Sequence, residues 1–265
     1  MPNNVLIIYE GARTEKRFIE NHFKTLGRLG AYTPFCYGCN IYNFYDLLVR
    51  NSNGSDFEYI DVLAILKGCD GVPSQADISI LQDNAFTDIF LVFDLDNHDN
   101  THSQEEKEAI LLKMAAKFKE STDGGLLLIN SPMVESYRDI NREKLPIIEL
   151  NDRIPVADSG KYKTIVGKRG FTKGISQYSE KTFHALARIH FEEIASILGL
   201  PKESNSLNEI DTERLLITTF DQANANGLLP IYNEMVLLAY IISFVRIEDA
   251  LETPLDQGTF EKGIR

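Results

Sequence analysis

Acidic side chains follow two apolar stretches of this sequence, and carboxylates placed in this way can bind a divalent cation. Glu10 comes directly after 5–9 (VLIIY), and Asp94 and Asp96 close 88–96 (DIFLVFDLD). Hard cations such as Mg²⁺ take oxygen ligands, often one or two carboxylates with waters and substrate phosphate oxygens. Side chains two apart in a strand point to the same side, so we expect Asp94 and Asp96 to share an ion. The alternative is that they only cap a turn.

The two stretches are typical of strands in a parallel sheet. They are rich in Val, Ile, Leu and Phe without a polar alternation, as in strands that helices cover on both faces. Ligands of such sheets bind beyond the carboxyl ends of the strands. We therefore predict an α/β fold with a Rossmann-like, mostly parallel sheet flanked by helices, and Glu10, Asp94 and Asp96 at one edge of it.

A third stretch completes the pattern. Residues 126–137 (LLLINSPMVESY) predict a strand over 126–130, after which Ser131 caps and Pro132 begins a short helix. This helix would place Glu135 one turn from the same edge of the sheet.

These motifs, in this order, resemble the Toprim domain of topoisomerases, primases and OLD-type nucleases. The segment 10–18 (EGARTEKRF) is most similar to the RloB-like branch, and the resemblance covers about the first 140 residues. Two features depart from the family pattern. The third segment has SPMVE where the family usually has NPCFE, and Thr14 stands where an acid is common, with Glu15 one residue later. The role of Glu15 is left open.

The resemblance implies a nuclease that uses Mg²⁺ or Mn²⁺ to hydrolyse phosphodiester bonds of DNA or of RNA such as tRNA. It implies that Asp94 and Asp96 hold metal, that Glu10 ligates metal or acts as a general base, and that Glu135 completes the site. Such chains commonly act beside an ATPase partner in defence against phage, so the resemblance also implies this partner.

A basic segment supplies the candidate substrate contacts. Residues 151–175 hold six basic and two acidic side chains, and 159–174 contain several glycines, which predicts a mobile basic loop over the substrate. We assign Lys168 as the catalytic cation. The candidate substrate-binding residues are Arg13, Lys161, Lys163, Arg169 and Lys173. The alternative is a solvated, lysine-rich loop.

The chain divides by its patterns into a Toprim-like domain over 1–150 and a basic loop with a helical lobe over 151–265, packed on the first domain. The lobe would contain helices at about 179–198, 206–221 and 230–245. From Glu192 to the end there are thirteen acidic and five basic residues. A rival function follows from this acidic part: a non-catalytic scaffold that docks a partner protein.

The motif 93–99 (FDLDNHD) also matches the first half of the haloacid-dehalogenase phosphatase motif. That family expects Thr or Val two residues after the second Asp, where this chain has His98, and it usually places the motif near the N-terminus. A phosphatase is therefore the weaker alternative.

Composition limits the remaining classes. The net charge of −12 disfavours a protein that coats duplex nucleic acid unaided. We expect a soluble cytoplasmic protein, because no secretion signal is evident, the apolar run 235–245 is too short to span a bilayer, and three cysteines do not suggest a disulfide framework. Cys36 and Cys39 have the spacing of zinc ligands, or are two small buried residues. The oligomeric state, a homo-oligomer included, is left open.

Overall fold

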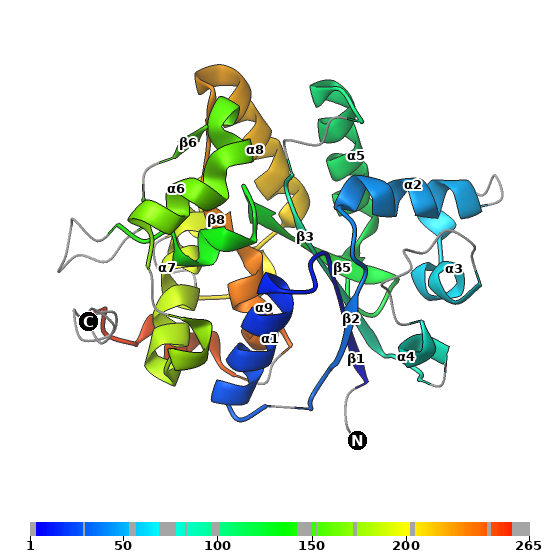
Figure 1. Ribbon diagram of the computed structural model, residues 1–265, viewed down its shortest axis with the longest axis horizontal. Coiled ribbons are helices and arrows are strands. Elements are labelled where there is room, and N and C mark those ends of the chain that lie inside the picture. Colours follow the sequence, from blue (N-terminus) through cyan, green and yellow to red (C-terminus); the bar gives the residue numbers. More distant parts are fainter. Residues whose placement is uncertain are drawn as a thin grey trace.

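A mostly parallel sheet lies at the centre of the protein (Figure 1). The computed structural model describes residues 4–28, 30–52, 57–68, 78–82, 84–96, 101–141, 150–151, 153–171, 174–201, 205–242 and 245–255. The strands of the central sheet are β1 (Val5–Tyr9), β2 (Thr33–Cys36), β3 (Asp88–Asp94), β4 (Lys119–Glu120), β5 (Gly125–Ser131) and β8 (Tyr232–Asn233). A separate antiparallel pair joins β6 (Ile154–Pro155) to β7 (Leu228–Leu229).

The register of the sheet brings three strand ends to one edge. The strand order is β2-β1-β3-β5-β4, with β8 also paired to β5, and the pairs among β2, β1, β3 and β5 are parallel. Tyr9 lies opposite Val92, and Asp94 lies opposite Asn130. The ends of β1 and β3 are therefore offset by two residues and those of β3 and β5 by one, so all three strands end near one edge. The predicted α/β class with a mostly parallel sheet is confirmed.

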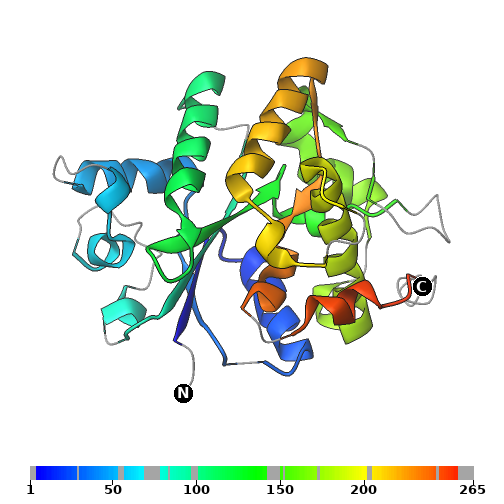
Figure 2. The same cartoon turned by 180° about the vertical axis from the view of Figure 1, so that it is seen from behind.

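Helices cover both faces of this sheet (Figures 1 and 2). The α-helices are α1 (Thr14–Thr25), α2 (Ile41–Asn51), α3 (Val62–Gly68), α4 (Ser79–Gln82), α5 (Gln104–Lys117), α6 (Tyr162–Arg169), α7 (Glu180–Leu198), α8 (Thr212–Asn226), α9 (Leu238–Ile241) and α10 (Ile247–Leu251). Short 3-10 turns include η2 (Val134–Arg138), η3 (Val156–Lys161), η4 (Ile175–Gln177) and η6 (Glu234–Leu237).

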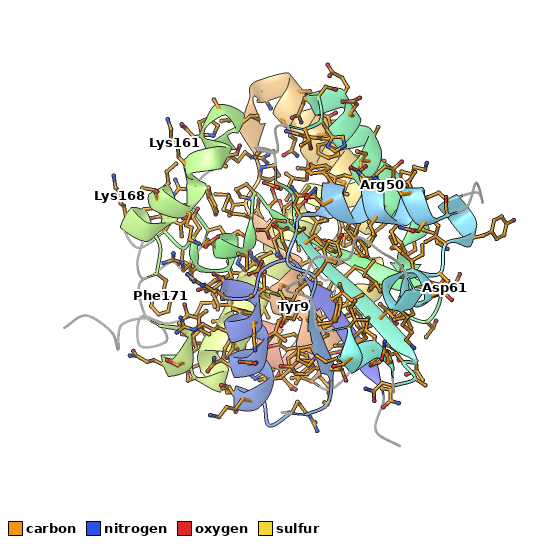
Figure 3. All side chains as sticks on the ribbon, turned by 45° about the vertical axis from the view of Figure 1, so that its right-hand side comes forward. Tyr9, Arg50, Asp61, Lys161, Lys168 and Phe171 are labelled. Carbon is orange, nitrogen blue, oxygen red and sulfur yellow. The ribbon has the colours of Figure 1, made fainter. Side chains whose placement is uncertain are left out.

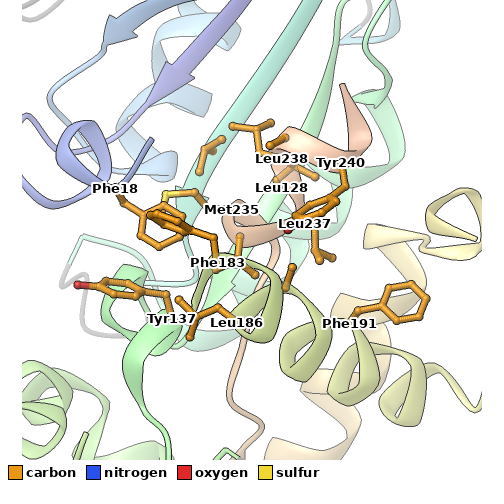
Figure 4. Close-up of a cluster of buried hydrophobic side chains, with 14 of the residues drawn as sticks. Phe18, Leu128, Tyr137, Phe183, Leu186, Phe191, Met235, Leu237, Leu238 and Tyr240 are labelled. Atoms are coloured by element: carbon orange, nitrogen blue, oxygen red, sulfur yellow. The ribbon is translucent and has the colours of Figure 1, made fainter. Parts of the chain in front are cut away.

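Alternate residues of each strand enter two separate apolar cores. On one face Ile7, Val92 and Leu128 pack with α1, α7, η6 and α9, and Figure 4 shows part of this core around Phe183 and Met235. The other core contains the alternate strand residues and is completed by α2, α3, α5, α6 and α8. Burial on both faces explains why these strands lack a polar alternation.

Two helix starts follow directly from the sequence. Ser103 and Ser179 accept hydrogen bonds from the backbone N–H groups three residues on, and each forms a capping box before α5 and α7. Gly199 ends α7 in the left-handed conformation at φ +63°, which is accessible to glycine without a side-chain clash. The expected helix over 179–198 is thus confirmed.

Two expectations for the C-terminal half are wrong. Residues 159–171 are not a loop, because η3 and α6 occupy most of this segment; the burial of Tyr162 and Val166 overrides the low helix propensity of its glycines and β-branched residues. Residues 230–245 do not form one helix either. Tyr232 and Asn233 pair with β5, and the helical turns begin only at Glu234.

The C-terminal half contributes to the same sheet and to both cores, through β8, α7 and α8. The division at residue 150 stays a prediction. Within the described ranges, no helix has the length and apolar character needed to cross a bilayer.

Candidate functional site

Glu10 lies directly beyond the end of β1 and is partly buried. One of its carboxylate oxygens, Oε2, accepts a hydrogen bond from the backbone N–H of Asp94 at 3.4 Å. Its own carbonyl oxygen accepts from the N–H of Gly38 at 2.9 Å and from the thiol of Cys36 at 3.7 Å. The turn after β2 therefore fixes the backbone of Glu10, and the carboxylate reaches the end of β3.

Asp94 is the last residue of β3 and is 9% exposed. The side-chain amide of Asn130, its partner on β5, donates to Asp94 Oδ1 at 3.1 Å. The Asn130 side-chain oxygen in turn accepts from the N–H of Met235 at 3.3 Å. Asn130 thus fixes the orientation of the Asp94 carboxylate and is itself held from the opposite side.

Asp96 lies past the strand, so the two-residue period of a strand does not position it. Its backbone has φ +44°, in the left-handed region that is uncommon for residues other than glycine. Its Oδ2 accepts from the side-chain amide of Asn40 at 2.9 Å, and Asn40 also accepts from the N–H of Asn43 as the N-cap of α2. The start of α2 therefore holds this carboxylate.

Glu15, whose role the sequence left open, points back toward Glu10 from the first turn of α1. It is 5% exposed, and its Oε1 accepts from the N–H of Gly11 at 2.9 Å. A Cβ atom at Gly11 would lie 2.6 Å from Glu15 Oε2, so a side chain at this position would displace the carboxylate. The glycine of the Glu-Gly pair thus makes room for a second acid.

Glu135 lies in η2, where it is 4% exposed. Its Oε1 is 3.1 Å from Nζ of Lys163 on α6. The charges of Glu135 and Lys163 act in opposite directions on the pKa of Glu15, which places both near that carboxylate. We call Glu10, Glu15, Asp94, Asp96 and Glu135 the acidic cluster.

Burial and the charges of neighbouring acids disfavour ionisation of Glu10, Glu15 and Asp94. Desolvation, followed by the charge of Asp96, raises the pKa of Glu10 above its ordinary value. Desolvation and the charge of Glu10 raise the pKa of Asp94 well above its ordinary value. A cation bound between these carboxylates would remove the repulsion.

The donor set has the chemistry that Mg²⁺ or Mn²⁺ requires, since Glu10, Asp94 and Asp96 supply hard oxygen ligands. In the parts of the chain that the structure describes, however, no three His, Cys, Asp or Glu residues are arranged as a preformed cation site. The carboxylates could then supply a Mg²⁺ ion with one or two ligands, with waters and substrate oxygens as the others.

The predicted basic residues divide into three groups. Lys163 reaches the acidic cluster. Arg13, Lys161 and Lys168 are exposed, as is the side chain of Lys163, and Figure 3 shows Lys161 and Lys168 at the outside of the molecule. Arg169 is turned instead toward the buried carboxylate of Asp139. Lys173 lies outside the described residues. The roles assigned to these residues stay predictions.

Cys36 ends β2 and Cys39 lies in the turn after it; both are free thiols and both are partly buried. The third cysteine, Cys69, lies outside the described residues. The zinc alternative therefore gains no further ligand from the described part of the chain.

The sequence interpretation missed two asparagines, Asn40 and Asn130. Asn130 is the one polar side chain inside the run 126–130, and a polar residue in a buried strand is a signal for a specific hydrogen bond. Asn40 stands before an apolar helical pattern, which identifies an N-cap but not its bond to Asp96.

Comparison with known proteins does not identify a family: no family model, no curated protein and no solved structure matches the chain.

Proposed function

We propose that this protein is a divalent-cation-dependent nuclease of the Toprim type, which hydrolyses phosphodiester bonds of DNA or RNA. One observation carries the proposal. Two acids from the ends of adjacent parallel strands, Glu10 and Asp94, meet here. Among the described residues, the side-chain charges that act most strongly on Glu10 are those of two other acids, Asp96 and Glu15. A buried charge without a compensating partner is costly, and such sites are often functional.

The residues would divide the work as follows. Asp94 and Asp96 would hold Mg²⁺ or Mn²⁺, oriented by Asn130 and Asn40. When bound, the cation would polarise phosphate oxygens and lower the pKa of bound water. Glu10 would serve as a further ligand or would accept the proton of the attacking water, a role that suits a carboxyl group whose pKa is raised.

We propose Lys163, rather than Lys168, as the positively charged side chain that supports the reaction. Its side chain is exposed like that of Lys168, but its ammonium group lies 3.1 Å from Glu135 of the acidic cluster. In the reaction a water oxygen bonds to phosphorus and the bond from phosphorus to the departing sugar oxygen breaks. Lys163 would stabilise the negative charge that develops on the phosphate oxygens.

Cleavage assays with a matched variant test this proposal. The substrates are plasmid, single-stranded DNA, tRNA and p-nitrophenyl phosphate, each with Mg²⁺ or Mn²⁺. We expect Asp94→Asn to lower cleavage of one nucleic acid by about 10³-fold or more. Asp88→Asn, the same change at the other end of β3, should retain activity.

The other outcomes are equally informative. Equal cleavage by wild type and Asp94→Asn would contradict the proposal. Hydrolysis of p-nitrophenyl phosphate alone would favour the haloacid-dehalogenase alternative. No cleavage of any substrate by the protein alone, followed by unchanged biological activity of Glu10→Ala, would favour the non-catalytic scaffold.

The Toprim resemblance extends the proposal to anti-phage defence with an ATPase partner. Copurification of an ATPase with the tagged protein from its native host, and loss of phage protection in Asp94→Asn, are the expected results. Protection that is unchanged in the variant would contradict this extension.

A further inference from the structure

A second buried carboxylate, Asp139, lies just after η2 and binds both ends of α6. It is fully buried. Arg169, the last residue of α6, donates from Nε to Oδ1 at 2.9 Å and from Nη2 to Oδ2 at 2.6 Å. Tyr162, the first residue of α6, donates its hydroxyl to Oδ2 at 2.9 Å, and Asn151 donates to Oδ1 at 2.7 Å. One carboxylate therefore holds an eight-residue helix at both termini.

The backbone adds a second attachment at the end of α6. The N–H of Phe171 donates to the carbonyl oxygen of Arg138 at 2.7 Å. A Cβ atom at Gly170 would lie 2.7 Å from that same oxygen, so this close approach requires glycine. The end of α6 is therefore docked on the residues at the end of η2.

This docking determines where Lys163 lies. Lys163 follows Tyr162 in α6, and its partner Glu135 precedes Asp139 by four residues. The two contacts between α6 and this segment thus form one unit: Asp139 with Arg169 and Tyr162 sets the position of the helix, and Lys163 then reaches Glu135. The charge of Asp139 is paired with that of Arg169, and its two carboxylate oxygens accept four hydrogen bonds. A buried ion pair is stable only when its partners are satisfied in this way.

We propose that Arg169 and Tyr162 are positioning residues that hold Lys163 at the acidic cluster, and that Arg169 does not contact the substrate. The catalytic part of this inference rests on the proposed nuclease function. Lysine cannot replace Arg169, because only the planar guanidinium donates two parallel hydrogen bonds to one carboxylate.

The first test measures the position of Lys163 without any substrate. Native protein is treated briefly with an amine-acetylating reagent, and modification of each lysine is followed by mass spectrometry. We expect Arg169→Lys to increase the acetylation rate of Lys163 about threefold, since its weak ion pair is lost. Lys168, on the same helix, should react at an unchanged rate. Equal rates for Lys163 in wild type and variant would overturn the inference.

The second test uses cleavage and a double-mutant cycle. We expect Arg169→Lys and Tyr162→Phe to lower kcat, by about tenfold for the arginine change, with KM nearly unchanged. In a Lys163→Met background, Arg169→Lys should have little further effect, because it acts through the missing lysine. A raised KM with unchanged kcat, or effects that multiply in the double variant, would overturn the inference.

The two tests separate the failure of this inference from that of the nuclease proposal. If wild type cleaves nothing, the acetylation result still decides whether Arg169 positions Lys163. If the wild type cleaves and the effects of Arg169→Lys and Lys163→Met on kcat multiply, the nuclease proposal is retained and the positioning role of Arg169 is rejected.

Discussion

Glu10 of the acidic cluster and Asp139 are two carboxylates whose surroundings compensate their charge to very different degrees. Asp139 is fully buried, and its two oxygens accept four hydrogen bonds, two of them from one arginine. Among the described residues, the Glu10 carboxylate accepts one hydrogen bond, from the N–H of Asp94 at 3.4 Å, and the charges of Asp96 and Glu15 act on it. Glu10 and Asp139 therefore differ mainly in how far their neighbours compensate the charge of the carboxylate.

The difference has a physical basis. A buried carboxylate with a bidentate arginine is stable without any ligand, so its loss affects folding. A buried carboxylate among other acids is a source of instability that a bound cation would relieve, so its loss affects binding and chemistry. Four predictions follow from this contrast, in order of decreasing expected effect.

Asp139→Ala should destabilise the protein most. It leaves the guanidinium of Arg169 and the hydroxyl of Tyr162 without their carboxylate, at an expected loss of about 3–5 kcal/mol in the free energy of unfolding. Urea unfolding at pH 7 measures this value. A loss as small as that for the exposed Asp123→Ala would remove the basis of the comparison.

Asn130→Ala should weaken cation binding and leave the fold intact. Asn130 orients Asp94, and the loss of a group that orients a metal ligand typically lowers metal affinity by about 10–100-fold. Isothermal titration with Mn²⁺ gives the dissociation constant. An unchanged constant would show that Asp94 does not bind the cation.

Glu234 provides a third kind of buried carboxyl. Desolvation raises its pKa to about 8. The Thr212 hydroxyl is 3.1 Å from the carbonyl oxygen of Leu127 and 3.0 Å from Glu234 Oε1, and it has a single hydrogen. The N–H of Ile129 also donates to Glu234 Oε2 at 2.7 Å. Desolvation outweighs both hydrogen bonds, so the neutral acid is the favoured form of Glu234 below about pH 8.

The pH dependence of stability should reveal this state. The stability that Glu234 contributes is fully present below its unfolded pKa, near 4.5, and is lost as the pH rises through its folded pKa of about 8. The limiting slope is about 1.4 kcal/mol per pH unit for one proton. Urea unfolding of wild type and Glu234→Gln between pH 5 and 8 should show a flatter profile for the variant. Equal slopes of the unfolding free energy against pH in wild type and variant would contradict a neutral, buried Glu234.

Glu10→Gln should produce a small effect of the opposite sign to that of Asp139→Ala. It removes a charge that Asp96 and Glu15 repel, and we expect a gain of about 1 kcal/mol in stability at pH 8 in EDTA. Mg²⁺ should raise the melting temperature of wild type more than that of the variant. A loss of stability in Glu10→Gln would indicate that Glu10 has a structural role like that of Asp139.

Much of the fold followed from local patterns. The apolar stretches at 5–9, 88–94 and 126–130 form strands of one parallel sheet because each lacks a polar alternation, and the parallel pairing places Glu10 and Asp94 at one edge. The helix over 179–198 was predicted for a similar reason, since the atoms that cap its start at Ser179 lie within four residues.

The basic segment shows where local reasoning failed. Its glycines and lysines predicted a mobile loop, yet Tyr162 and Val166 are buried and α6 forms. From this composition we assigned Lys168 as the catalytic cation, and Lys163 and Arg169 as substrate-binding residues. Their environments differ because Glu135 pairs with Lys163, whereas Asp139 pairs with Arg169. Both acids lie before this segment in the sequence.

The sequence by itself determined the types and order of the acidic residues and the strands that end at Glu10 and Asp94, because side-chain chemistry and strand burial are local properties. Only the tertiary structure decided which acids are compensated: Asn40 with Asp96, Lys163 with Glu135, and Arg169 with Asp139. Electrostatic compensation depends on distance in space and on exclusion of water, and both arise only when segments far apart in the chain pack together.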